Sequence, residues 1–238
     1  MPDRIRYPGL KGKMAISTGF TILAVALSMA FGCAPGGKLP PVAEAPEVPP
    51  PSAQIPVSEE TGVQRLADGR EGFSIVQPST LDGAALADFE RAVVLMNQAD
   101  YSGAIALLEK VVEKFPENTA ARINLGMACA RNGQAEQAET HLQKALTLFP
   151  GHPVACNEYG LLLRKAGRFA EARTIYEQAL AKFPEYLPVH KNLGILCDIY
   201  LNDPACAVGH YEIYSEATPQ DDQIRIWIAD LRMRLGNR

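Results

Sequence analysis

The strongest constraint on the fold is a set of residues that recurs every 34 positions. The recurring residues are Phe115-Pro116, Phe149-Pro150 and Phe183-Pro184; Gly126, Gly160 and Gly194; and Ala104, Ala138 and Ala172. Self-similarity at a period of this length indicates an array in which each repeat is one supersecondary unit. Gly133 and Gly167 fall in the middle of their units, where a break between two helices is expected. The spacing therefore predicts stacked helix–turn–helix repeats.

The residue types in the period predict close packing of two antiparallel helices within each unit. The glycine and alanine series are small, so the helices can approach closely. A larger side chain follows four residues after each alanine, and the apolar stripe continues one turn later at helical spacing. These residues are Leu108, Leu142 and Tyr176, then Val111, Ala145 and Ala179. Each Phe-Pro pair ends the second helix, because the residue before proline is disfavoured in the α region.

This pattern strongly resembles the tetratricopeptide repeat (TPR) family, and the resemblance covers about 85–220. It implies an all-α solenoid of about four helix–turn–helix repeats, framed within 81–220 as 85–118, 119–152, 153–186 and 187–220. The first repeat carries Ala92 where the others have glycine. The fourth repeat has Asn202-Asp203-Pro204 between its helices and holds one extra residue. Its later pattern residues therefore match when shifted by one: Ala207, Tyr211, Tyr214 and Pro219.

A further helix is predicted over 221–238, starting at Asp221-Asp222. Apolar residues follow at helical spacing, namely Ile224, Ile228, Leu231 and Leu235. Arg232 and Arg234 lie near its end, where basic residues suit the helix dipole. A solenoid must cover its last hydrophobic face. We therefore interpret this segment as a capping helix in which Trp227 packs.

The TPR resemblance also implies a groove, lined by the first helices of successive repeats, that binds a peptide or a partner helix. The groove positions carried over from the family are Phe89, Val93, Met96, Ile123, Asn124, Met127, Arg131, Asn157, Glu158, Leu161, Arg164, Lys191, Asn192 and Ile195. Asn124 and Asn192 occupy the place where an asparagine hydrogen-bonds a bound extended chain in several TPR proteins. Glu158 interrupts that series. Arg131, Arg164 and Lys191 give a partial likeness to the carboxylate clamp of chaperone-binding TPR proteins.

The first 32 residues predict a secretory signal. Basic residues (Arg4, Arg6, Lys11, Lys13) precede an apolar run from about Met14 to Gly32. The end of the run, up to Cys33, resembles the lipobox of bacterial lipoproteins. That resemblance implies cleavage before Cys33, acylation of this cysteine and, because Ala34 is not Asp, the periplasmic face of the outer membrane. An inner-membrane anchor with a periplasmic domain and an ordinary signal cleaved near Ala30 are the alternatives.

Residues 33–80 are rich in proline and alanine, which predicts a flexible linker that cannot bury enough surface to fold alone. Within it, Phe73-Ser74-Ile75-Val76 is a short apolar run, interpreted either as a stray strand or as a loop. The four other cysteines are Cys129, Cys156, Cys197 and Cys206. Cys197 and Cys206 fall on facing helices and can form a disulfide, although small buried thiols are the favoured interpretation.

Several functional classes find no support in the sequence. The net charge of −4 does not suggest nucleic-acid binding. No phosphate loop, nucleophile elbow or metalloprotease motif occurs, so we predict no enzyme and no cofactor. Cys206 and His210 are four residues apart on a helix, but no second pair completes a metal site, so no metal is expected.

The resemblance to TPR lipoproteins implies a scaffold or adaptor at the bacterial envelope. Its expected contacts are protein partners and, through the lipid, a membrane. Lipid-anchored TPR proteins of this layout include assembly factors of type IV and Tad pili. A chaperone-like holdase and a regulatory subunit of an envelope enzyme are the alternatives.

Overall fold

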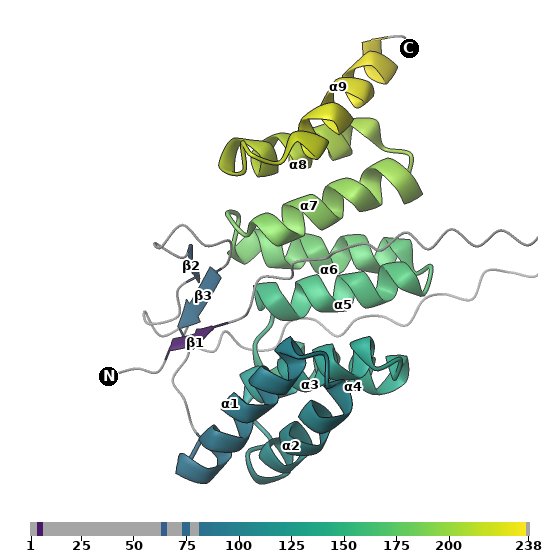
Figure 1. Ribbon diagram of the computed structural model, residues 1–238. Coiled ribbons are helices and arrows are strands. Elements are labelled where there is room, and N and C mark those ends of the chain that lie inside the picture. Colours follow the sequence, from purple (N-terminus) through teal and green to yellow (C-terminus); the bar gives the residue numbers. More distant parts are fainter. Residues whose placement is uncertain (1–3, 7–62, 66–72, 77–80, 237–238) are drawn as a thin grey trace, which may run out of the picture. The chain divides into compact units, whose positions relative to one another are not determined.

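The computed structural model describes residues 4–6, 63–65, 73–76 and 81–236. Its helices follow one another as antiparallel pairs joined by short turns (Figure 1). The pairs are α1 (Gly83–Asn97) with α2 (Tyr101–Lys114), α3 (Thr119–Arg131) with α4 (Ala135–Leu148), α5 (Pro153–Lys165) with α6 (Phe169–Lys182), and α7 (Leu187–Ile195) with α8 (Pro204–Ala217). A π-helix, η1 (Leu196–Tyr200), extends α7, and α9 (Asp222–Gly236) follows α8. The first helix, α1, starts two residues before residue 85, where the first repeat was framed to begin.

Three short strands form an antiparallel sheet in the order β1-β3-β2. They are β1 (Arg4–Arg6), β2 (Val63–Arg65) and β3 (Phe73–Val76). The strand considered for Phe73–Val76 is therefore present. Its two partners were not anticipated, since they fall in segments interpreted as signal peptide and linker. The apolar run 14–32, Cys33 and most of the linker lie outside the described residues.

The recurring small residues lie where the two helices of a repeat touch, as predicted. A Cβ atom on Gly126 would lie 2.7 Å from Cγ of Leu142, and one on Gly194 would lie 2.5 Å from Cδ1 of Tyr211. The facing alanines Ala138, Ala172 and Ala207 are fully buried. At these distances any side chain in place of the glycine requires the partner helix to move.

The turn inside each repeat contains one residue with a positive φ angle. From the first repeat to the fourth, this residue is Ala99 (φ 62°), Gly133 (φ 83°), Gly167 (φ 76°) and Asn202 (φ 50°). Glycine reaches this conformation without steric cost and asparagine tolerates it, whereas alanine does not favour it. The same turn therefore recurs four times, with an unfavourable residue in the first repeat.

The extra residue of the fourth repeat is accommodated by η1. A π-helix arises when one residue is inserted into an α-helix, and the insertion widens the local turn. Gly194 precedes this segment and matches the 34-residue period, whereas Ala207 follows it and matches when shifted by one. The first helix of the repeat absorbs the insertion, so Tyr211 still packs on Gly194.

The helix α9 covers the last repeat by burying Ile224, Ile228 and Leu231. Trp227 packs partly in this cap, with its ring 5.5 Å from the ring of Tyr211. Leu235, which was expected to continue the buried stripe, is 36 % exposed and lies one residue before α9 ends. Within residues 81–236, no helix combines the length and apolarity needed to span a bilayer.

Candidate functional site

The first helices of the repeats lie next to one another, because α3 contacts α5 and α5 contacts α7. We call the side chains that they present the first-helix face. Its polar members are Asn124, Arg131, Asn157, Glu158, Arg164, Lys191 and Asn192, and Ile195 is an apolar, half-buried member. All of them were predicted as groove residues, and side-chain contacts bring four of them together: Arg131, Asn157, Glu158 and Asn192.

The predicted groove residues divide by burial. Phe89, Ile123 and Met127 belong to the hydrophobic core, and Asn124, Asn157 and Glu158 are buried polar residues. The remaining members are half-buried: Val93, Met96, Arg131, Leu161, Arg164, Lys191, Asn192 and Ile195. The half-buried side chains are those that a partner can reach without rearrangement of the array.

A chain of polar contacts, which we call the polar ladder, connects three repeats across the first-helix face. Nδ2 of Asn192 donates a 2.8 Å hydrogen bond to Oδ1 of Asn157. Nδ2 of Asn157 donates to Oε1 of Glu158 at 3.3 Å, and Nη2 of Arg131 lies 3.4 Å from Oε2 of Glu158. Buried polar groups need such partners to offset their lost hydration. The polar ladder thus links α3, α5 and α7 through side chains alone.

Asn124, Glu158 and Asn192 occupy equivalent positions but have different environments. Nδ2 of Asn124 donates to the carbonyl of Ala120 on its own helix at 2.8 Å, whereas Asn192 reaches across to α5. Burial raises the pKa of Glu158, and the nearby positive charge of Arg131 opposes that rise. The two asparagines that the family resemblance treats alike are therefore not equivalent here.

Two of the three basic residues on this face are neutralised within the chain. Arg131 pairs with Glu158, and Nζ of Lys191 lies 2.9 Å from Oδ2 of Asp221 and 4.8 Å from the ring of Tyr214. Arg164 has no carboxylate partner among the described residues. A clamp that uses several free cations is therefore not formed. The pairing of Asp221 with Lys191 was not predicted from the sequence, because Asp221 was expected only to start the capping helix.

Two histidines of the fourth repeat form a contact that the sequence did not suggest. Nδ1 of His190 lies 3.0 Å from Nδ1 of His210, and Nε2 of His190 lies 2.7 Å from the carbonyl oxygen of Pro184. A carbonyl can only accept, so we infer that Nε2 of His190 carries a proton. In the neutral pair, Nδ1 of His210 then donates to Nδ1 of His190. Burial, with the charge of His190 as a further cause, lowers the pKa of His210 to about 4.

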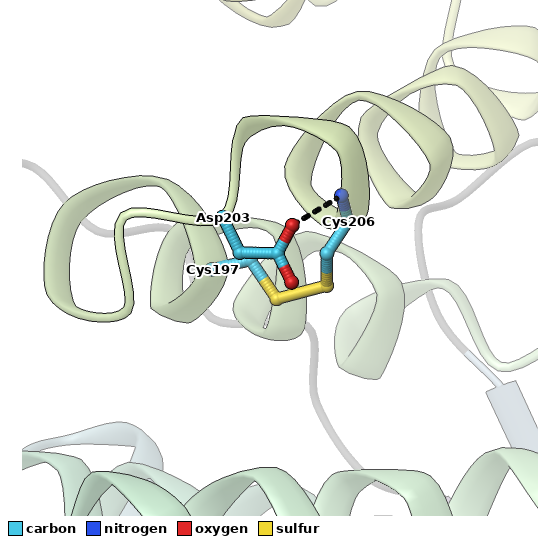
Figure 2. A group of neighbouring side chains, drawn as sticks. All are labelled: Cys197, Asp203 and Cys206. Atoms are coloured by element: carbon cyan, nitrogen blue, oxygen red, sulfur yellow. Dashed lines mark hydrogen bonds between the residues drawn. A yellow bond between two sulfur atoms is a disulfide. The ribbon is translucent and has the colours of Figure 1, made fainter.

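Cys197 and Cys206 form a disulfide that joins η1 to the first turn of α8 (Figure 2). The favoured interpretation of both as buried thiols was wrong for this pair, because the insertion in η1 and the short turn bring their Cα atoms to 5.9 Å. Cys129 and Cys156 are buried free thiols, and burial raises their pKa to about 11 and about 12 respectively. At neutral pH both are therefore protonated and unreactive.

Asp203 lies beside the disulfide, so its carboxylate and the two sulfurs form a compact group (Figure 2). With both sulfurs bonded to each other, this group provides no thiolate ligand. Oδ1 of Asp203 accepts a hydrogen bond from the backbone N–H of Cys206 at 3.1 Å and so caps α8. In the oxidised protein these three residues therefore stabilise the start of a helix.

The comparisons with known proteins agree with this architecture. Residues 89–153 and 130–193 each match a family described as tetratricopeptide repeat. A crystal structure of MamA protein superposes with a TM-score of 0.56 at 20 % identity, covering 64 % of this chain and 82 % of that one. A structure of Pseudomonas aeruginosa pilF gives a TM-score of 0.59 at 22 % identity, covering 65 % of this chain and 70 % of that one.

The Naa15/Naa10 complex bound to HypK-THB gives a TM-score of 0.54 at 23 % identity, covering 65 % of this chain and 23 % of that one. No curated protein matches the sequence significantly. At these sequence identities, the likeness to the solved structures shows a shared fold and does not show a shared function. Residues 89–193 are therefore tetratricopeptide repeats, and the described helices form an all-α TPR solenoid.

Proposed function

We propose that this chain is a membrane-anchored scaffold or adaptor of the bacterial cell envelope, which binds a peptide or helix of a partner protein on its first-helix face. The observation that carries the proposal is the polar ladder. Its amide and carboxylate groups include both donors and acceptors, as the backbone of a bound chain requires. Arg131, Arg164, Asn192 and Ile195 are half-buried beside or within the polar ladder and therefore accessible to a partner.

The envelope location rests on the N-terminal sequence. The basic start, the apolar run and Cys33 favour export followed by lipid attachment. Several acyl chains on one cysteine give firm anchoring, whereas a single chain binds only marginally. The disulfide between Cys197 and Cys206 agrees with this location, because disulfides persist in oxidising compartments. The outer membrane is the proposed site, since Ala34 stands where aspartate would favour the inner membrane.

Assembly of a pilus or secretion machine is one role that suits this layout. The proposal rests on the combination of an exported, lipid-anchored start with a TPR solenoid. The fold likeness to pilF of Pseudomonas aeruginosa is compatible with it. No catalytic constellation was found in the sequence, so the proposed role is non-catalytic.

The anchor is tested with Cys33→Ser in the native host, using metabolic labelling with a fatty acid and membrane fractionation. The proposal expects label on the wild-type protein and, on the variant, no label and release from the outer membrane. An unlabelled wild type that stays with the membrane would contradict it. If the labelled wild-type protein is found in the inner-membrane fraction, the proposed location at the outer membrane is wrong.

Partner binding is tested with the double variant Asn157→Ala, Asn192→Ala, which removes the contact between α5 and α7 in the polar ladder. Quantitative co-purification from detergent extract should show one stoichiometric partner for the wild type and a clear loss for the variant. Gln178→Ala, an exposed change on the second helix α6, is the matched control. Equal recovery in all three proteins would exclude the polar ladder as a binding element. A large set of unfolded clients would instead indicate a holdase.

A further inference from the structure

Arg164 is the one basic residue of the first-helix face that has no carboxylate partner in residues 81–236. It lies near the C-terminal end of α5, and its guanidinium carbon is 5.9 Å from the centre of the Tyr200 ring. Nη1 of Arg164 is buried and makes no hydrogen bond. Arg131 and Lys191, the neighbouring cations, are each bound to a carboxylate. Of these three cations of the first-helix face, Arg164 is therefore the one without a carboxylate partner in the described helices.

Two buried phenol groups lie in the electrostatic environment of the same residue. The hydroxyls of Tyr176 and Tyr211 are buried and without a hydrogen-bond partner. Burial raises the pKa of both phenols, and the charge of Arg164 opposes the rise in each case. Tyr176 packs on Gly160, which lies one helical turn before Arg164 on α5. The third and fourth repeats thus each contain one buried phenol without a hydrogen-bond partner in the described part of the chain.

Unsatisfied buried donors are uncommon in native proteins, because each costs free energy when it is removed from water without a new partner. A guanidinium that has no carboxylate partner among the described residues, and whose Nη1 is buried and makes no hydrogen bond, favours an acceptor-rich, negatively charged ligand. A carboxylate fits this requirement, since it accepts two hydrogen bonds from one arginine. Charge complementarity therefore identifies the chemistry of the occupant.

The surface beside Arg164 is apolar and accessible. Ile199 is 63 % exposed and Tyr200 is 45 % exposed, both on η1. Ile195 is half-buried one turn earlier on α7. An exposed aromatic ring next to a cation, with an exposed apolar residue adjacent to it in sequence, forms a surface that an acidic residue with an apolar neighbour can cover. The insertion that creates η1 belongs to this repeat alone among the four, so the surface is not repeated along the array.

We propose that Arg164 anchors a single carboxylate of the partner segment, while an adjacent apolar side chain of that segment packs on Ile199 and Tyr200. The inference rests on the proposed binding function and specifies its ligand as an acidic residue next to a hydrophobic one. It differs from a clamp of several cations, because the other two basic residues are already occupied. The carboxylate belongs to an acidic side chain of the partner segment.

The test uses the full chain in detergent and a random dodecapeptide library displayed on phage. The proposal expects selected peptides to carry Asp or Glu next to Leu, Ile or Phe. Synthetic versions are then measured with free and with amidated C-termini: equal affinity is expected for a side-chain carboxylate, and loss of binding on amidation would overturn the inference. Selection of peptides without an acidic residue would overturn this inference while leaving the binding function intact. No selected peptide at all would overturn both.

The role of Arg164 is tested by a double-mutant cycle. Arg164→Gln should weaken a selected peptide about 10- to 100-fold, the range for one charge-assisted hydrogen bond. Replacing the acidic peptide residue by its amide should weaken binding to the wild type similarly and add little to Arg164→Gln. Arg164→Lys should restore part of the affinity, and Arg173→Gln on α6 should leave it unchanged. Less than a twofold effect of Arg164→Gln in a folded variant would contradict the proposal.

Discussion

The phenol ring of Tyr176 on α6 lies directly against the backbone of Gly160 on α5. A Cβ atom at residue 160 would lie 2.5 Å from Cζ of this ring, closer than side-chain atoms approach one another in proteins. Tyr176 is fully buried, so its ring has little room to withdraw. This contact fixes the distance between the two helices of the third repeat.

Gly160→Ala should therefore destabilise the protein, because the added methyl group forces α5 and α6 apart. Overpacking of this kind costs about 1–3 kcal/mol in the free energy of unfolding. The measurement is urea unfolding followed by circular dichroism. Gly209→Ala is the matched control: it lies within α8, nothing surrounds it within 4 Å, and it should be neutral or slightly stabilising. Equal behaviour of the two variants would contradict this account of the repeat.

Ala99→Gly should stabilise the protein. Ala99 has a φ of 62° at the turn where the second and third repeats carry glycine. The left-handed conformation costs a non-glycine residue roughly 1–2 kcal/mol, and the greater unfolded-state entropy of glycine offsets part of the gain. We expect a net gain of about 0.5–1 kcal/mol in urea unfolding. Asn202→Gly should gain less, since asparagine tolerates this conformation. A loss of stability with Ala99→Gly would show that the turn is not strained.

The fold was largely predictable because a repeat encodes the same contact several times. Gly126, Gly160 and Gly194 all face a second helix, and each supports the interpretation of the others. The insertion in the fourth repeat was visible as a shift of one residue. Its location in η1 was not, because the cost of widening a helical turn depends on packing that the sequence does not display. The strands β1 and β2 lack any periodic signal and were missed for that reason.

The candidate site was less predictable. Position within a repeat places Asn124 and Asn192 on the first-helix face, but it does not say which partner each amide finds. Asp221 lies beyond the fourth repeat and Tyr200 lies in η1, where the inserted residue shifts the pattern, so no family position identified their contacts with groove residues. Which basic residues of this face find a carboxylate depends on the neighbouring helices. That Arg164 has none among the described residues could therefore be seen only in the three-dimensional structure.

Reduction of the disulfide should destabilise the fourth repeat. The bond closes a loop between residues nine positions apart, and chain entropy predicts a contribution of about 2–3 kcal/mol for a loop of this size. Urea unfolding with and without a dithiol reductant measures it, and alkylation of free thiols confirms the redox state. The double variant Cys197→Ser, Cys206→Ser should have the same free energy of unfolding as the reduced wild type, and the reductant should not change it. If the reductant still lowers the stability of this variant, the disulfide is not the source of the stabilisation.

Stability should decrease as the pH falls from about 6.5 to 4. Burial lowers the pKa of His152 to about 3 and that of His210 to about 4, whereas an unperturbed histidine has a pKa of 6.5. The unfolded chain therefore binds protons first, so the contribution of these neutral histidines is complete above pH 6.5 and is lost below it. The urea midpoint at pH 7.5 and pH 5 measures this loss.

His210→Asn is the informative variant for the pH dependence. It keeps a hydrogen-bonding group near the position of Nδ1 but does not titrate, so it should reduce the loss between pH 7.5 and pH 5. His152 continues to titrate, and some loss should remain. Arg173 and Glu177 lie close enough to influence His210 and are unchanged in this variant. The same pH dependence in wild type and variant would exclude the histidine pair as its source.

Binding on the first-helix face is the central claim, and site-specific photo-cross-linking in the native host tests it most directly. A photoreactive amino acid is placed at Asn192, on the first-helix face, and separately at Glu177, an exposed residue of α6. The account predicts a discrete cross-linked product from position 192 and none from position 177. A product from position 177 alone, or the same product from both, would show that the partner does not bind the first-helix face.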